Sequence, residues 1–180
     1  MTVNLSDIGD QTSGAAEGYA AAAERIEIEI GKPMGRVLDV GCNVGAGMEA
    51  LAALWPDAVM NGLEPVAELT VKARAKGFRV HTGKAEGMPW PEEVFDLVIS
   101  RHSLEHVEFR RRAILEMRRV LVPGGHVYIQ APVEPGGSKN KLHLSPFESA
   151  EELRTAMLEC FREIYWGPQE TVAEFIGRAE

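Results

Sequence analysis

The sequence predicts an α/β fold built on a doubly wound, mostly parallel sheet with helices on both faces. Three observations lead to this prediction. The 180 residues suit one domain with a sizeable core. Short apolar runs alternate with helix-like stretches between residues 36 and 130, which is the pattern of strand–helix–strand units. The run VFDLVIS at residues 94–100 is almost continuously apolar, as in a strand that is buried on both faces.

The elements follow in chain order. An alanine-rich helix is predicted from Ala15 to Ile30, although its last residues, RIEIEI, also suit a strand, and GKPMG then ends it. Strands are predicted at residues 36–40, 58–63, 78–81, 94–100 and 126–130. Helices are predicted at residues 45–55, 66–76 and 109–120, and a last helix from Ser145-Pro146 to about residue 159.

The C-terminal third completes the sheet. VPGG at residues 122–125 is predicted to form a turn before the fifth strand. Residues 161–166 and 171–178 flank Gly167-Pro168-Gln169 and are predicted to pair as a hairpin, giving a seven-stranded sheet with one antiparallel edge strand. The stretch at residues 131–146 is rich in Pro and Gly, and a loop of this length in a compact domain is usually functional or disordered.

Composition and charge exclude several classes of protein. The net charge is −8, and binding to nucleic acid or to an anionic membrane needs clustered basic residues, so neither partner is expected. The basic run Arg110–Arg112, with Arg118 and Arg119, is interpreted as the solvated face of a helix. No apolar stretch approaches the roughly 20 residues that cross a bilayer, so membrane insertion is not expected.

The N-terminal sequence and the number of cysteines indicate the compartment in which the protein is expected. The start MTVNLSDIGD has neither the basic nor the apolar region of a signal peptide, and residues 1–14 are interpreted as a polar lead-in. Cys42 and Cys160 are too few for a disulfide framework or a zinc site of their own. We therefore expect a cytoplasmic protein that is a monomer or a homodimer.

The turn after the first strand, VLDVGCNVGAG at residues 37–47, indicates a ligand site. Ligands of doubly wound sheets bind at the carboxyl ends of the strands. A dinucleotide fingerprint requires G-x-G-x-x-G directly after the strand, and Asn43 stands where its second glycine would be. Asp39 would repel a pyrophosphate but suits a ligand with an amino group and a sulfonium. Asn43 tolerates the left-handed conformation that glycine favours, so the turn can still form.

The second strand ends in a further candidate. It closes on Gly62-Leu63-Glu64-Pro65, and a carboxylate at this place accepts hydrogen bonds from both ribose hydroxyls in adenosyl-type and NAD-type sites alike. Pro65 ends the strand and starts the next helix. An NAD-dependent oxidoreductase therefore stays open as a less favoured alternative.

Four segments together resemble a known family. VLDVGCNVGAG, GLEP, GKAEGMPWPEEVFDLVISRHSLEHV and RRVLVPGGHVYIQAP resemble the successive motifs of class I S-adenosylmethionine-dependent methyltransferases, in particular the methyltransferase type 11 group that includes quinone-biosynthesis methyltransferases. The resemblance covers residues 36–132 most strongly. It implies a Rossmann-like fold, with residues 31–180 as the methyltransferase domain and residues 1–30 as an N-terminal segment with a helix, in a single domain overall.

The resemblance also implies an activity. The protein would transfer a methyl group from S-adenosyl-L-methionine to a small-molecule acceptor, with O-, C- and N-methylation all open. A protein that binds this cofactor without transferring the methyl group is the main alternative. The implied cofactor-binding residues are Tyr19, Asp39, Gly41, Cys42, Asn43, Gly45, Glu64, Pro65, Ala85, Glu86, Ser100 and His102.

Individual roles follow from the same resemblance. Asp39 and Gly41 would hold the methionyl end of the cofactor, and Glu64 would bind the ribose hydroxyls. Ala85 and Glu86 match the adenine-binding segment. Lys84 stands where the family commonly has an acid, so the adenine amine is bound either by Glu86 or by the backbone of residues 84 and 85. Tyr19 would fold over the carboxylate of the cofactor.

Catalytic residues are less determined, because methyl transfer needs position more than an acid or a base. His102 follows the fourth strand and could orient or deprotonate an acceptor hydroxyl. His143 lies in the long loop and could touch the acceptor. His106, in the family's "LEH" element, would position the following helix. His102, Glu105 and His106 have the spacing of metal ligands, but the sequence shows no further ligand, so no metal is expected.

Overall fold

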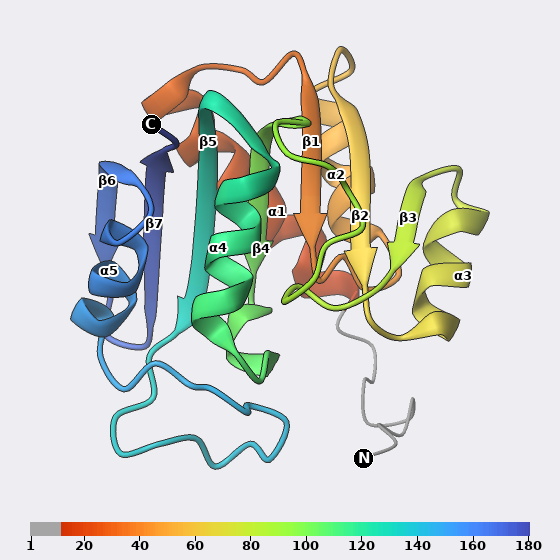
Figure 1. Ribbon diagram of the computed structural model, residues 1–180. Coiled ribbons are helices and arrows are strands. Elements are labelled where there is room, and N and C mark those ends of the chain that lie inside the picture. The colour runs from red at the N-terminus through yellow and green to blue at the C-terminus, as the bar shows by residue number, and fades with distance from the viewer. Residues whose placement is uncertain (1–11) are drawn as a thin grey trace.

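The computed structural model describes residues 12–180 (Figure 1). Residues 1–11, which make up most of the predicted lead-in, lie outside the described residues. The helices are α1 (Thr12–Ile30), α2 (Ala46–Leu54), α3 (Ala67–Ala75), α4 (Arg110–Val120) and α5 (Ala150–Leu158), with a short 3₁₀ helix η2 (Leu104–His106). The strands are β1 (Arg36–Val40), β2 (Val59–Glu64), β3 (Arg79–Thr82), β4 (Phe95–Arg101), β5 (Leu121–Pro132), β6 (Arg162–Pro168) and β7 (Val172–Arg178).

The sheet is doubly wound. Its strand order is β3-β2-β1-β4-β5-β7-β6, and β1 pairs in parallel with both β2 and β4. The chain therefore reverses its direction of winding between β1 and β4, which is the place where such sheets bind ligands. Strand β7 is antiparallel to both β5 and β6. The predicted fold is confirmed, with the antiparallel strand in the edge pair and β6 outermost.

Two apolar cores cover the two faces of the sheet. Successive side chains of a strand point to opposite faces, so Leu38 of β1 and Val98 of β4 join the core under α4 and α5. Val37 and Leu97 join the core that contains Ile26 of α1. Figure 1 shows α4 and α5 on the near face and α1 behind the sheet. Asp39 follows the alternation of Val37, so its side chain faces α1.

The segment before α5 differs from the prediction. The helix begins at Ala150 and not at Ser145, because Ser149 acts as its N-cap and accepts a hydrogen bond from the Glu152 amide. The residues before it form turns and bends, and Phe147 among them forms a bridge with Val133 and is fully buried. The loop between β5 and α5 is thus pinned near its end. In Figure 1 it lies below the carboxyl ends of the parallel strands.

The predicted turn at residues 122–125 lies inside a strand. β5 begins at Leu121, which pairs with Phe95, and the next pair is Leu97 with His126. The extra residues on β5 form a bulge in which Gly124 has a φ of +79°. A bulge accommodates the Pro-Gly-Gly sequence within the ladder, so the strand is longer than the apolar run alone predicts.

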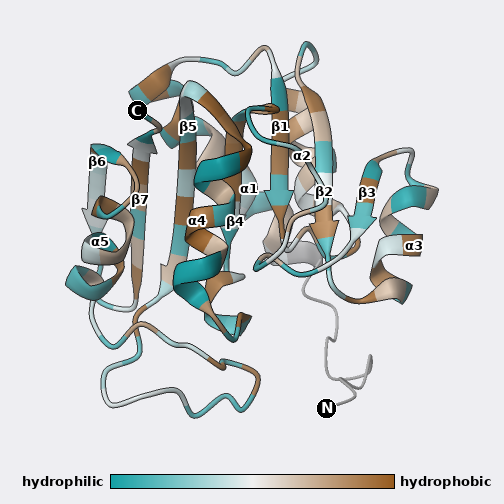
Figure 2. Ribbon diagram, viewed as in Figure 1, coloured by the Kyte–Doolittle hydropathy of each residue, from teal (hydrophilic) through white to brown (hydrophobic). Residues whose placement is uncertain are grey.

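The basic run on α4 is only partly a solvated face. Arg111 and Arg112 are exposed, as predicted. For Arg110 the prediction is wrong, because its guanidinium donates to the carbonyls of Ser145 and Pro146 and pairs with Glu152. It is also wrong for Arg119, which donates to two carbonyls in the segment before β4. Figure 2 shows hydrophilic and hydrophobic residues on different sides of α4.

Within residues 12–180, no helix is both long enough and apolar enough to cross a membrane.

Candidate functional site

The turn after β1 is built from left-handed residues. Gly41, Asn43 and Gly45 have φ values of +81°, +50° and +79°. The expectation that Asn43 adopts this conformation is confirmed, and its side-chain Oδ1 accepts a hydrogen bond of 2.7 Å from the Val44 amide. Three such residues within five fold the chain back tightly between β1 and α2. The turn sits at the carboxyl end of the central strand.

Asp39 lies beneath this turn, with an exposed fraction of 1%. The Tyr19 hydroxyl of α1 donates to its Oδ1 at 2.7 Å, and Oδ2 has no partner among the described residues. Burial raises the pKa of Asp39 to about 7, against the Tyr19 hydrogen bond and the positive charge of Arg101, which both lower it; the nearby charge of Glu64 raises it further. The Asp39 carboxyl group is therefore closed off from solvent at the end of β1.

Glu64 at the end of β2 connects the two strand ends. Its Oε2 accepts from the Asn43 amide and its Oε1 from the Val66 amide, both at 2.9 Å. Burial raises the pKa of Glu64, and these two amides oppose the shift. Each carboxylate oxygen has a second lone pair, so the group can still accept from a ligand. Pro65 is exposed next to it, directly before α3.

The small residues near the turn make room for protein side chains. A Cβ on Gly41 would lie 2.5 Å from the Ser103 Cβ, and one on Gly47 would overlap the Tyr19 ring. Cys42 is 3% exposed, and its Sγ would lie 2.6 Å from a Cβ on Gly62. Burial is also the main cause that raises the pKa of this thiol. The Cys42 side chain is therefore packed against protein, and its amide donates to the Leu63 carbonyl at 3.2 Å.

The predicted adenine segment lies beside the end of β2, because the Gly83 amide donates to the Glu64 carbonyl at 3.1 Å. Ala85 is buried. The Oε1 of Glu86 accepts from the amides of Glu108 and Phe109 at 3.0 and 3.4 Å, at the start of α4. Anionic side chains stabilise a helix N-terminus, so Glu86 has a structural partner that the sequence did not indicate.

Ser100 ties strands together. It is fully buried, and its Oγ lies 2.6 Å from the Ser103 Oγ, which donates to the Val40 carbonyl at 2.7 Å. This bridge joins the ends of β4 and β1. Ser100 therefore helps to hold the ends of β1 and β4 together, next to the turn after β1.

Arg101 is a residue that sequence reasoning left without a role. Its guanidinium lies over the Tyr19 ring, 5.6 Å from the centroid, and occupies the space that a side chain on Gly18 would fill. Its Nε is buried and has no partner within residues 12–180. A charged residue at the end of a buried strand was the available signal.

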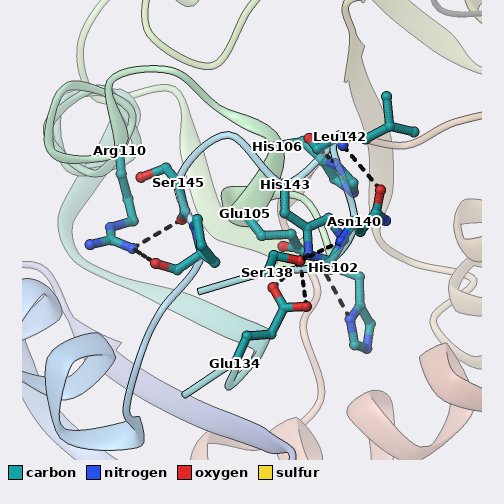
Figure 3. Close-up of polar contacts among 11 residues, drawn as sticks. His102, Glu105, His106, Arg110, Glu134, Ser138, Asn140, Leu142, His143 and Ser145 are labelled. Atoms are coloured by element: carbon teal, nitrogen blue, oxygen red, sulfur yellow. Dashed lines mark hydrogen bonds and ion pairs between the residues drawn. The ribbon is translucent and has the colours of Figure 1, made fainter. Parts of the chain in front are cut away.

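The two predicted catalytic histidines both lie near Glu105. His102 has a φ of +49°, and its Nδ1 is 3.7 Å from the Glu105 Oε1. His143, in the loop after β5, has its Nδ1 2.6 Å from the Glu134 Oε2, and its ring meets the His106 ring edge-on with centroids 4.9 Å apart (Figure 3). The tertiary structure thus brings the loop histidine to the residues that follow β4.

The strand order defines a Rossmann-like α/β domain in which two buried acids, Asp39 and Glu64, lie at the switch point of the sheet. Residues 38–129 match the sequence model of a family described as methyltransferase domain, type 11, and the chain belongs to this family. A demethylmenaquinone methyltransferase of Chlorobaculum parvum is 32% identical over 133 residues, which cover 72% of this chain and 54% of that protein. The chain spans about half the length of the curated relatives it matches.

Solved structures share the fold. The [4+2]-cyclase SpnF superposes with a TM-score of 0.78 at 20% identity, covering 91% of this chain and 81% of that one. A geranyl diphosphate C-methyltransferase from Streptomyces coelicolor A3(2), in complex with Mg²⁺, geranyl diphosphate and S-adenosyl-L-homocysteine, gives a TM-score of 0.73 at 14% identity, covering 89% and 80%.

Proposed function

We propose that the protein binds S-adenosyl-L-methionine at the ends of β1, β2 and β4 and transfers its methyl group to a small-molecule acceptor. The observation that carries this proposal is the pair of buried carboxylates, Asp39 and Glu64, on either side of a left-handed turn. Two acids favour a cationic sulfonium and ammonium over a pyrophosphate. Membership of the methyltransferase family supports the same cofactor.

Each part of the cofactor has a candidate partner. Glu64 accepts from the ribose hydroxyls with its remaining lone pairs. The backbone of Gly41 to Asn43 lines the methionyl end, and the unpartnered Arg101 Nε suits the cofactor's carboxylate, because a guanidinium matches a carboxylate in shape and charge. The adenine amine is a donor, so its acceptor is either a backbone carbonyl of residue 84 or 85 or the Glu86 carboxylate, whose Oε1 also accepts the amides of Glu108 and Phe109.

Methyl transfer is an in-line displacement in which the cofactor supplies the electrophile. The protein supplies position and a site shielded from water. His102, half-exposed beyond the end of β4, is the group proposed to orient an acceptor hydroxyl or accept its proton. Ser100 is fully buried and takes no part in this step.

A second candidate function is cofactor binding without methyl transfer. The observation that favours it is the structural similarity to a [4+2]-cyclase, because one fold can support different reactions. The acceptors named for the methyltransferases it resembles, a demethylmenaquinone and geranyl diphosphate, favour the methyl-transfer reading with a small organic acceptor.

Calorimetric titration followed by turnover separates these readings. We expect S-adenosylmethionine and S-adenosylhomocysteine to bind with one site per chain, and NAD not to bind. Release of S-adenosylhomocysteine with a panel of hydroxyl, amine and activated-carbon acceptors then reports transfer. Binding of NAD alone would overturn the proposal, and cofactor binding without turnover on any acceptor class would favour the second candidate.

A further inference from the structure

Three side chains with metal-ligand chemistry meet beside the proposed acceptor side. Glu105 and His106 lie on η2, and His143 lies on the loop after β5. One ligand atom from each lies within 4.8 Å of the other two, and Figure 3 shows His106 and His143 next to each other. The sequence alone predicts no metal, because it shows no further ligand near His102, Glu105 and His106. The folded loop supplies one.

Both imidazoles are oriented by hydrogen bonds on Nδ1. The His106 Nδ1 lies 3.0 Å from the Leu142 carbonyl, and the His143 Nδ1 lies 2.6 Å from the Glu134 carboxylate. A carbonyl or a carboxylate only accepts, so Nδ1 is the donor in both contacts, and in the neutral ring Nε2 keeps its lone pair. A histidine that ligates a metal through one nitrogen and donates to a carboxylate or carbonyl through the other is the usual arrangement.

The carboxylate of Glu105 is a second, independent indication. Glu105 has an exposed fraction of 1%, and its Oε2 has no hydrogen-bond partner among residues 12–180. Its other oxygen lies 3.7 Å from His102, too far for a hydrogen bond. A buried carboxylate without a partner is unfavourable, and coordination of a cation removes this cost.

The loop is held against η2 by its backbone. The Ser145 amide donates to the Glu105 carbonyl at 3.0 Å, and Arg110 holds the carbonyls of Ser145 and Pro146. The Glu134 side chain that orients His143 also accepts from the Ser138 hydroxyl at 2.7 Å. His143 is therefore fixed from both sides, whereas His106 is exposed, so an ion can enter from solvent.

We propose that Glu105, His106 and His143 bind one divalent transition-metal ion, such as Zn²⁺, Mn²⁺, Fe²⁺ or Co²⁺. Two imidazoles and one carboxylate select this class over Mg²⁺ or Ca²⁺, which prefer oxygen ligands. Ligand atoms around such an ion at about 2.0–2.2 Å are at most about 4.4 Å apart, so small side-chain rotations complete the site.

Three protein ligands leave coordination positions free. The cluster lies close to the turn after β1. Ser103, two residues before Glu105, donates a hydrogen bond to the Val40 carbonyl, and its side chain fills the space beside Gly41. We assign to the ion the binding of an acceptor oxygen, such as a hydroxyl or a carboxylate. This assignment rests on the proposed methyl transfer, whereas the metal site itself does not.

The test is a titration of tag-free, chelator-treated protein with Co²⁺, followed by visible absorption and by metal analysis after desalting. We expect one ion per chain. His143→Ala and Glu105→Gln should each weaken binding by more than 100-fold, and Glu134→Gln, which loses the orienting charge, by about 10–100-fold. His81→Ala is the matched control, because His81 is exposed on β3, and it should bind as the wild type does.

The outcomes distinguish the two proposals. No Co²⁺ bound at micromolar concentrations, or equal binding by the wild type and His143→Ala, overturns the metal site. Cofactor titration on the same samples reports the proposed function separately, because Asp39 and Glu64 lie outside the metal cluster. Turnover that a chelator abolishes and Zn²⁺ or Mn²⁺ restores supports the acceptor role, whereas turnover unaffected by the chelator overturns that role.

Discussion

Replacement of Asp39 by asparagine tests the central electrostatic feature of the site. The Asp39 carboxyl group is buried, with one oxygen hydrogen-bonded to the Tyr19 hydroxyl and the other without a partner among the described residues. The pKa of the Asp39 carboxyl group is raised from 3.8 to about 7, mainly by burial. An asparagine side chain has nearly the same shape, can still accept a hydrogen bond from the Tyr19 hydroxyl, and carries no charge at any pH. The change therefore isolates the cost of the buried charge.

The magnitude follows from linkage. Because its pKa is raised, the folded protein holds the Asp39 proton more tightly than the unfolded chain does. This contribution to stability is fully present below about pH 4 and is lost as the pH rises through about 7. The shift of about three pKa units corresponds to roughly 4 kcal/mol in total, of which about 3 kcal/mol is lost between pH 5 and pH 8.

Urea unfolding of the cofactor-free protein between pH 5 and pH 8 measures this effect. The difference in unfolding free energy between Asp39→Asn and the wild type should grow in favour of the variant by about 3 kcal/mol over this range. Asp57→Asn, at an exposed position, is the control and should show no such trend. In return, Asp39→Asn should bind S-adenosylmethionine more weakly. A stability difference that is the same at every pH would refute the reasoning.

Three further changes probe the same framework. Glu64→Gln should weaken binding of S-adenosylmethionine by about 1.5–3 kcal/mol, because a charged acceptor of hydrogen bonds is lost; unchanged affinity in calorimetry would mean that β2 does not hold the ribose. Gly47→Ala should destabilise the protein by about 1–3 kcal/mol in urea, because the added Cβ overlaps the Tyr19 ring, and a neutral result would show that α1 moves freely there. Ser149→Ala should cost about 1 kcal/mol through loss of the α5 N-cap; a variant as stable as the wild type in urea would contradict the cap.

Local patterns made most of the fold predictable. The sequence pattern predicted every strand, and β1 was predicted with its observed bounds, Arg36–Val40. The exception in extent is β5, which begins at Leu121 and not at residue 126. The left-handed conformation of Asn43 was also predictable, because it depends on the residue type and its immediate neighbours. The start of α5 was misplaced because Ser145-Pro146 and Ser149 are both acceptable helix starts in sequence. Only packing of Phe147 into the core decides between them.

By itself, the sequence determined the fold class, because short segments carry their own periodicity and turn chemistry. Its motifs also resemble those of the family to which the chain belongs, and they indicated the two acids, Asp39 and Glu64, that flank the turn after β1. The tertiary structure decided which side chains share an environment. In the folded chain Asp39 is buried and hydrogen-bonded to Tyr19, and Glu86 accepts from an amide at the start of α4. His143 lies beside Glu105 and His106. The physical reason is that these contacts join residues that are far apart in the sequence. They depend on how the intervening segments fold against the sheet, which the spacing of residues along the chain does not determine.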